Sequence, residues 1–326
     1  MMSTQAEPLP DEMEAQLAGL PRDLANSLRS LRQAIVDREK ADANVAPAAP
    51  QPAGPPPCAT PRKILKFPIF PTDTRALVNE LASSALFAAI QGKDRKLVKD
   101  MPVAAMGETQ MFFTGELLNQ DDHDVFMQLV YLASSEPLGA YVTVSGHSLL
   151  KALGRGTSGK EHKQLEAEIK RLTNGGLEVK TKRYSYIGHL IHDAVKDEES
   201  KQWVYRLNER LVFLYGASCY TLIDWEQRKR LKGKDLARWL QLEIARHAVP
   251  FPVKVETLRE RSGSQTKELW KFRQLLKETL ETLKAEGHIA AWQIDENDLV
   301  HIDRGNAISA SQRRSLMLPK PRSRTP

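Results

Sequence analysis

The sequence has little of what would mark it as a secreted or membrane-spanning protein. It contains only two cysteines, Cys58 and Cys219, in 326 residues, which argues against a disulfide framework and against a structural zinc site. No apolar run reaches the roughly 18–20 residues needed to cross a bilayer. The first residues are acidic, unlike the basic and then apolar start of a secretory signal. These absences predict a cytoplasmic protein.

A recognisable catalytic constellation is also missing. Gly154–Lys160 has the glycine and lysine spacing of a phosphate-binding loop, but Glu161 stands where that loop needs serine or threonine. We interpret it as a tight turn between two helices. Asp121–Asp124 reads as a negatively charged helix start rather than a metal site, and His189 and His192 lack partners at ligand spacing. We expect no enzyme activity, no cofactor and no metal.

The net charge of +6 does not by itself indicate DNA binding, because it is concentrated outside the central part of the chain. Residues 1–43 carry −3, residues 62–66 carry +3 and the stretch from residue 305 to the end carries +5, which leaves +1 for residues 67–304. A prediction of DNA binding must therefore rest on local clusters of basic residues.

Composition and element order predict the domain organisation. Proline and alanine dominate residues 43–57, which is typical of an extended linker. We expect a mobile N-terminal region over 1–60, a connecting segment over 61–104 and a basic flexible tail over 305–326. Residues 105–215 and 216–304 are each predicted to contain a helix, a short strand, two helices and a hairpin, which is the order of a winged helix. The predicted fold class is α+β, with two tandem winged-helix domains.

The elements of the two domains follow from apolar periodicity and turn residues. In the first domain we expect a strand over 111–115, a helix from Asp121 to Leu132 and a strand over 141–145. A helix over 147–154 capped by Ser145, a helix over 159–176, and strands over 177–186, 187–195 and 201–207 follow. In the second we expect a helix over 233–248, a strand over 251–255, a short helix ending at Gly263, a long helix capped by Ser264, and a hairpin over 288–294 and 298–302. The long helix places leucines and Phe272 inward at spacings of three and four.

Basic residues cluster at several of these elements. Lys267, Trp270, Lys271, Arg273 and Gln274 lie on or beside the polar front of the last long helix. Such a helix can enter a major groove, where arginine reads guanine and glutamine reads adenine. A solvated helix face has the same pattern, and spacing alone does not separate the two. The other candidates for DNA contact are Lys160, Lys163, Lys170, Arg171, Lys180, Lys182, Arg183, Arg228 and Arg230.

Six stretches of the chain, in order between residues 83 and 303, resemble TrfA-type plasmid replication initiators. They read TGELL (114–118), PLGAYVTVS (137–145), KRL (170–172), RLVFLYGASCYTLIDWEQRKRL (210–231), ARWLQLEIARHAVPFPVKVETLRERSGS (237–264) and NDLVHI (297–302). The resemblance implies tandem winged helices that bind double-stranded DNA at direct repeats, called iterons, of a plasmid origin. It also implies local strand opening and a monomer–dimer equilibrium in which dimers hold the copy number down.

The same resemblance implies partners and site residues. The partners are the host replication initiator, the replicative helicase and the sliding clamp. By position, Lys271 and Arg273 match the basic part of the family's second DNA-facing helix, while Trp270 stands where a lysine is expected. The family's clamp-binding motif has the form Gln-Leu-x-Leu-Phe, whereas residues 64–70 read ILKFPIF here and lack the glutamine.

Two other functions remain open on the residues alone. A transcriptional repressor or partition protein with the same folds would act as a permanent dimer on a palindromic site. A relaxase or primase would need a metal-binding cluster or a nucleophilic tyrosine beside one, and Tyr184 and Tyr186 lack such neighbours.

Overall fold

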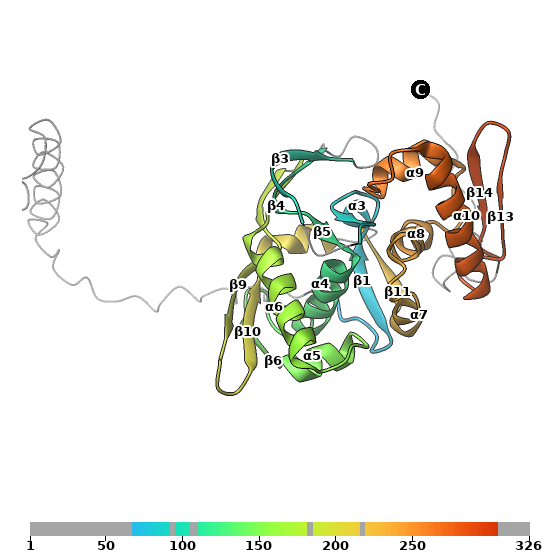
Figure 1. The fold of residues 1–326 in the computed structure, drawn as a ribbon. Helices are drawn as coiled ribbons and strands as arrows, with labels where there is room; N and C mark the ends of the chain where they lie inside the picture. Colours follow the sequence, from blue (N-terminus) through green and yellow to red (C-terminus); the bar gives the residue numbers. More distant parts are fainter. Residues whose placement is uncertain (1–66, 92–94, 105–109, 181–184, 216–218, 306–326) are drawn as a thin grey trace, which may run out of the picture. The chain divides into compact units, whose positions relative to one another are not determined.

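The computed structural model describes residues 67–91, 95–104, 110–180, 185–215 and 219–305. All of them belong to one unit, which spans residues 63–326. The predictions for residues 1–60 and for the tail beyond Gly305 lie outside the described residues. Helices and strands are mixed throughout, so the α+β class is confirmed (Figure 1).

The first half of the described chain contains the predicted order of elements. Helix α4 (Gln120–Ala133) is followed by strand β6 (Val142–Ser145), helix α5 (Gly146–Ala152) and helix α6 (Gly159–Asn174). The hairpin of β9 (Ile191–Lys196) and β10 (Gln202–Leu207) completes an antiparallel sheet with the strand order β6-β10-β9. As predicted, Ser145 caps α5, and Gly154 turns the chain between α5 and α6 with a φ of 65°.

The second half repeats this arrangement with shorter strands. Helix α8 (Asp235–Ala245) precedes strand β12 (Val253–Lys254), helix α9 (Val255–Arg261) and helix α10 (Leu269–Ala285). The hairpin of β13 (Ala291–Ile294) and β14 (Leu299–Asp303) gives the strand order β12-β14-β13. In both halves the strand before the helix pair therefore lies against the second strand of the hairpin. Figure 1 places hairpin β9–β10 at the left and hairpin β13–β14 at the right.

The first half also carries a second antiparallel sheet, and one of its strands is the one predicted over residues 111–115. Strands β3 (Leu97–Val103), β4 (Gln110–Glu116), β7 (Gly176–Lys180) and β8 (Ser185–His189) form a four-stranded antiparallel sheet. Residues 187–195 do not form the single strand expected from their alternation, because the chain leaves this sheet at Leu190 and joins the next with β9. Two short pairs, β2 (Phe87–Ala88) with β5 (Leu118–Asn119) and β1 (Thr74–Val78) with β11 (Tyr220–Asp224), add to the first half.

The remaining elements are α3 (Asn79–Ala82), a 3-10 helix (Glu209–Tyr215) and α7 (Trp225–Arg230). Much of the segment predicted to connect the domains therefore contributes β1, α3, β2 and β3. Phe67 and Phe70 lie in the first hydrophobic core, where their rings contact Tyr215 and Tyr220. These two aromatic residues of the stretch 64–70 are buried, so their side chains serve the fold.

The described residues form two hydrophobic cores. The first extends from Phe67 to Trp225 and also includes Leu242 of α8, and the second extends from Leu231 to Val300. The inward side of α10 consists of Phe272, Leu276, Leu280 and Leu283, as the spacing predicts. Fully burying one such side chain stabilises a fold by about 1.5–3 kcal/mol. This apolar back fixes which side of α10 faces solvent.

One predicted helix start is wrong. Ser264 does not cap α10, because the helix begins five residues later at Leu269 and the Ser264 hydroxyl accepts a hydrogen bond from the backbone N–H of Thr266 instead. Within the described part of the chain, no helix is long and apolar enough to span a membrane.

Candidate nucleic-acid interface

The front of helix α10 is exposed and carries groups that can contact DNA. Trp270, Lys271 and Gln274 lie opposite the buried leucines, as predicted. The indole of Trp270 is 60% exposed, and the ammonium of Lys271 lies 5.4 Å from the centre of one of its rings. A cation, an amide and an aromatic ring on one exposed helix face can make groove and backbone contacts. Lys267 is exposed just before the helix begins.

Lys277 belongs to the same front and was missed from the sequence. It is exposed and follows Gln274 by three residues, a spacing that places both side chains on one side of a helix. That spacing was the available signal. Lys271 is paired with Glu268 at 3.3 Å, but both side chains are about half exposed, so the pair costs little to break.

Arg273 makes a specific contact with the wing of the same half. Its Nε and Nη2 atoms donate to the two carboxylate oxygens of Asp298, at 2.8 and 2.7 Å. This hydrogen-bonded pair raises the pKa of Arg273 and lowers the pKa of Asp298. The prediction that Arg273 reads guanine stays a prediction, but one edge of its guanidinium is already occupied.

Helix α6 exposes basic residues mainly at its N-terminal end. Ser158 caps the helix, and Lys160 and Lys163 in its first turns are exposed. Lys170, further along, is exposed but donates to Glu166 at 2.8 Å. Lysines in the first turns of a helix, beside its unpaired backbone N–H groups, can contact DNA phosphates.

Two of the predicted DNA contacts have other roles. Arg228 is fully buried: it donates from Nε to Asp124 at 2.8 Å and from Nη2 to Gln120 at 2.7 Å. The prediction that it reaches phosphate is wrong, because its charge is neutralised inside the protein. Arg171 has a side chain only 12% exposed and pairs with the buried Asp122 at 2.8 Å, so it anchors α6 rather than facing DNA.

These arginines belong to a group of charges around the first turn of α4. Arg238 of α8 donates from Nη1 to Asp121 at 2.8 Å and to Asp124 at 2.9 Å, and also pairs with Asp235. Burial alone would raise the pKa of Asp121, but Arg238 and Arg155 outweigh it and the pKa is lowered. The acidic run interpreted as a helix start thus also joins the two halves.

The cap of α4 itself comes from Asn119. Its side chain accepts from the backbone N–H groups of Asp121 and Asp122, and the Asp122 side chain accepts from the Asn119 N–H in return. Arg155, in the turn before α6, donates to both carboxylate oxygens of Glu168 on α6, whose pKa is raised by burial. Several acidic and basic groups near α6 are therefore used to hold the helix in place.

The other predicted residues lie at separate places. Lys180, at the end of β7, is exposed and pairs with Glu178 at 2.8 Å. Arg230, at the end of α7, is about half exposed and pairs with Glu286 at 3.0 Å. Lys182 and Arg183 lie outside the described residues. The structure therefore brings the residues of α10 into one group but does not add Arg228 or Arg171 to it.

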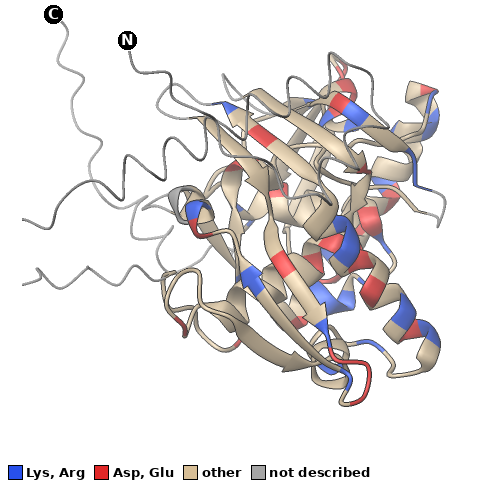
Figure 2. Ribbon diagram, turned by 90° about the vertical axis from the view of Figure 1, so that its left-hand side faces the viewer, with Lys and Arg blue, Asp and Glu red and all other residues tan. Residues whose placement is uncertain are grey.

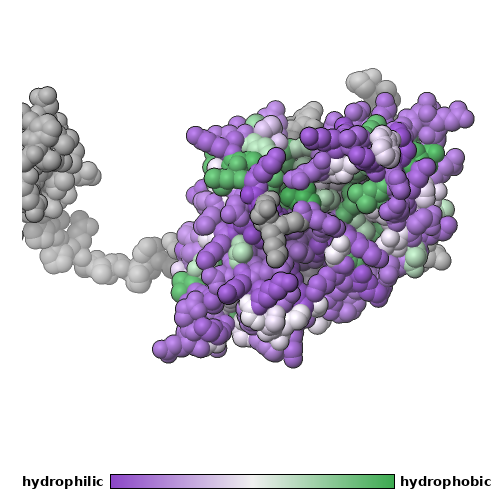
Figure 3. Space-filling model, in the orientation of Figure 1, coloured by the Kyte–Doolittle hydropathy of each residue, from purple (hydrophilic) through white to green (hydrophobic). Residues whose placement is uncertain are grey.

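In Figure 2, ribbon segments of Lys and Arg lie among those of Asp and Glu on the side of the molecule that faces the viewer. Figure 3 shows a mostly hydrophilic face with separate hydrophobic patches.

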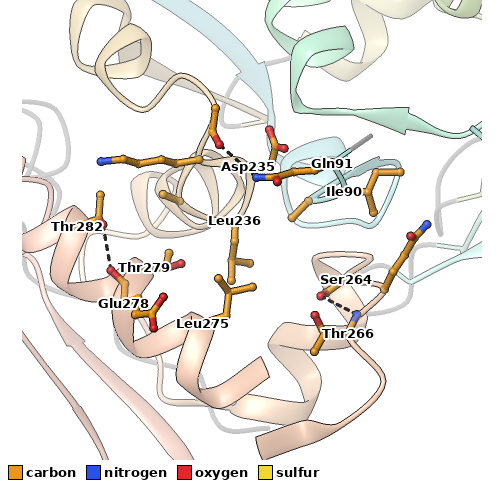
Figure 4. A pocket seen from close by; sticks show the side chains of 15 residues that line it. Ile90, Gln91, Asp235, Leu236, Ser264, Thr266, Leu275, Glu278, Thr279 and Thr282 are labelled. Carbon is orange, nitrogen blue, oxygen red and sulfur yellow. Dashed lines mark hydrogen bonds between the residues drawn. The ribbon is translucent and has the colours of Figure 1, made fainter. Parts of the chain in front are cut away.

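A cleft of about 580 Å³ lies between α10, the start of α8 and residues 89–91 (Figure 4). Its two carboxylates are engaged: Asp235 pairs with Arg238, and Glu278 accepts a hydrogen bond from Gln274. Elsewhere in the described ranges, no group of three or more His, Cys, Asp or Glu side chains is placed to hold a metal ion.

Comparison with known proteins identifies a matching family and several similar proteins. The sequence profile of the family described as TrfA protein matches residues 63–304. A curated relative, the plasmid replication initiator protein TrfA of Escherichia coli, is 27% identical over 244 residues, which is 72% of this chain and 63% of the relative. The chain thus spans somewhat less than two thirds of the length of that relative.

Two solved structures are similar at low identity. The Pi initiator protein in complex with iteron DNA is 13% identical, with a TM-score of 0.44, and the match covers 57% of this chain and 95% of that one. Domains 2 and 3 of RctB are 10% identical, with a TM-score of 0.46, and the match covers 66% of this chain and 94% of that one.

Proposed function

Because the chain belongs to the TrfA family, we propose that it is a plasmid replication initiator that binds directly repeated sites in double-stranded DNA. In this role it acts without catalysing a reaction of its own. The match to the family extends over both halves of the described chain, so we propose that both halves bind DNA together.

Each half is interpreted as a winged-helix domain. In both halves a helix and a short strand precede a pair of helices, and a hairpin follows the pair. The second strand of the hairpin lies between the short strand and the first strand of the hairpin, in the orders β6-β10-β9 and β12-β14-β13. In this interpretation α6 and α10 are the DNA-facing second helices of the two pairs, and hairpins β9–β10 and β13–β14 are the wings. Two different domains in one chain can contact one direct repeat without two-fold symmetry.

The observation that carries the proposal is the exposed front of α10. Its apolar back fixes the helix, while Trp270, Lys271, Gln274 and Lys277 face outward. Such a front fits a major groove, where glutamine can pair with adenine and lysine with guanine or phosphate. Lys160 and Lys163 at the start of α6 supply phosphate contacts from the other half.

We extend the proposal to the later steps of initiation. Binding to several repeats at a plasmid origin promotes local strand opening, and the protein recruits the host replication initiator and the replicative helicase. The monomer is the active form in a monomer–dimer equilibrium. Phe67 and Phe70 are buried in the first core, so we do not expect residues 64–70 to recruit the sliding clamp.

The experiment is a binding assay of the full chain on duplexes that carry direct repeats from the DNA flanking its gene. Shuffled repeats and inverted repeats of equal length are the controls. We expect preference for the direct repeats, and neutralising about six phosphates should give a log–log salt slope of about −5. A flat salt response, or equal binding to shuffled DNA, would contradict the proposal; preference for inverted repeats would favour a dimeric repressor.

A further inference from the structure

The wing turn of the second half holds one acidic side chain against helix α10. Asp298 lies between β13 and β14, and its carboxylate accepts both hydrogen bonds from Arg273. The two side chains are each about one third exposed. This pair therefore lies at the edge of the exposed front of α10, beside Lys277 and Gln274 along the helix.

The turn fixes Asp298 independently of the helix. The Asp295 carboxylate accepts from the backbone N–H groups of Asn297 and Leu299, both at 2.9 Å. The Asp298 N–H donates to the Asp295 carbonyl, and the Asp298 carbonyl accepts from Val255. A second contact between wing and helix, from the Trp292 indole N–H to Glu281 at 3.0 Å, holds the hairpin further along α10.

The geometry leaves one edge of the guanidinium available. Arginine has five N–H donors in a planar fork, and Asp298 uses the edge formed by Nε and Nη2. The opposite edge, formed by Nη1 and the second N–H of Nη2, can donate to the O6 and N7 atoms of guanine. A fixed guanidinium plane loses less side-chain freedom on binding than a free one.

We propose that Asp298 is a positioning residue, which holds the guanidinium of Arg273 in the plane needed to read one guanine. The inference rests on the proposed DNA-binding function. It makes the wing part of base recognition, since the wing turn sets the orientation of a side chain on the helix. Asp298 itself does not touch DNA.

The backbone at Asp298 supports a role for its side chain. Its φ of 62° is in the left-handed region, which glycine adopts freely and which costs other residues free energy. Glycine would suit this backbone better, yet it would leave Arg273 without its partner. Replacing Asp298 with glycine therefore removes the carboxylate without straining the turn, which makes it a clean test.

Removing Asp298 should change DNA affinity in two opposite ways, one through its charge and one through the orientation of Arg273. Losing a negative charge near DNA should raise affinity for all sequences alike. Losing the orientation of Arg273 should instead weaken binding only to sites that carry the guanine. The two explanations thus predict changes of opposite sign on the preferred site.

The test begins with the sequence that the full chain selects from random duplexes, followed by competition against every single-base-pair change. Arg273→Ala should lower discrimination at one guanine about tenfold or more. Asp298→Gly and Asp298→Asn should lower discrimination at the same base pair about threefold to tenfold, with binding to random DNA unchanged or tighter. The double variant Arg273→Ala/Asp298→Gly should lose no more than Arg273→Ala.

Glu296→Gln is the matched control, because Glu296 is an exposed acid of the same turn and its loss removes the same charge. It should leave discrimination unchanged at every base pair. Circular dichroism and thermal melting of each variant verify that the fold is retained. If Arg273→Ala loses discrimination but both Asp298 variants keep it, the inference is overturned and the proposed function stands. If Arg273→Ala also keeps full discrimination, Arg273 does not recognise a base and the inference is overturned. If the wild-type protein prefers no sequence, the proposed function itself is overturned.

Discussion

Helices α6 and α10 occupy the same place in the two halves but use their charged residues differently. In α6, Glu168 and Arg171 are buried or nearly so and pair with Arg155 and Asp122. In α10 the buried side chains are apolar apart from Thr279, and the charged ones stay at least partly exposed. Both helices bury an apolar side, but buried ion pairs help to anchor α6, whereas the buried side of α10 contains no charged residue.

This contrast between the two helices indicates where base recognition can take place. A charged side chain held in a buried pair is costly to release, whereas one on an exposed face moves to DNA at little cost. The free lysines of α6 lie only at its start, where they suit phosphate. The front of α10 carries lysine, glutamine and tryptophan along two turns. We therefore expect α10 to read sequence and α6 to contact the backbone.

The largest expected effect is on the free energy of unfolding. It should differ between two arginines, one in each helix, that each pair with an aspartate. Arg171→Met in α6 leaves Asp122 buried without its closest partner and should lower the free energy of unfolding by about 3 kcal/mol. Arg273→Met in α10 breaks a pair that is about one third exposed and should cost less than about 1 kcal/mol. Urea unfolding of both variants measures the difference. Equal losses would remove the distinction between the two helices.

The next effect concerns DNA binding. Arg273→Ala should cost about 1–3 kcal/mol on the preferred site and mainly at one base pair. Lys163→Ala in α6 should weaken binding to all sequences by the same factor. Fluorescence anisotropy on the preferred site and on random duplex gives both numbers. If Lys163→Ala changed the preference of the protein for one base pair, α6 would be a reader as well.

Acid should act on the half that contains α10 through His288, which follows the end of that helix. Burial, followed by the charge of Arg230, lowers the pKa of His288 to about 4. Below about pH 6.5 the unfolded histidine binds a proton that the folded protein does not bind until about pH 4, so the free energy of unfolding falls as the pH falls through this range. Between pH 7.5 and 5.5 this loss should be about 1.3 kcal/mol.

The variant His288→Asn tests this assignment. Its free energy of unfolding should fall less on acidification than that of the wild type, by about the same 1.3 kcal/mol. Urea unfolding at the two pH values measures both slopes. An unchanged slope in the variant would place the acid sensitivity elsewhere.

The smallest expected effect concerns the contacts of individual α6 lysines with DNA phosphates. Lys160→Ala should lower the magnitude of the log–log salt slope by about 1 unit if its ammonium contacts one phosphate. Lys170→Ala should change it less, because Lys170 is already paired with Glu166. A salt titration of both variants on random duplex tests the order. The reverse order would place the phosphate contact at the far end of α6.

The sequence predicted the order of elements well, because that order depends on local patterns. The leucine spacing of α10, the cap at Ser145 and the glycine turn at Gly154 each act within a few residues of the element they define. The front of α10 followed directly from the same spacing. Strands β1, β2 and β3 could not be predicted from local patterns. Either their pairing partners lie far away in the sequence or their apolar runs are short.

The ion-pair partners of the charged residues could not be predicted either, because these partners also lie far apart in the sequence. Arg228 and Asp124 are separated by 104 residues in the chain, and no local period relates them. The acidic run Asp121–Asp124 was read as a helix start, which explains its position but not its partners on α7 and α8. The link between Arg273 and Asp298 likewise depends on the wing folding back onto α10.

The most direct test of the account compares matched pairs of lysines in the two helices. The variants Lys271→Ala/Lys277→Ala and Lys160→Ala/Lys163→Ala each remove two exposed positive charges, and selection from random duplexes gives the sequence that each full-length protein prefers. We predict that the α6 variant selects the wild-type sequence with lower affinity, and that the α10 variant loses preference at adjacent base pairs. Loss of preference in the α6 variant, with the wild-type sequence retained by the α10 variant, would contradict the account.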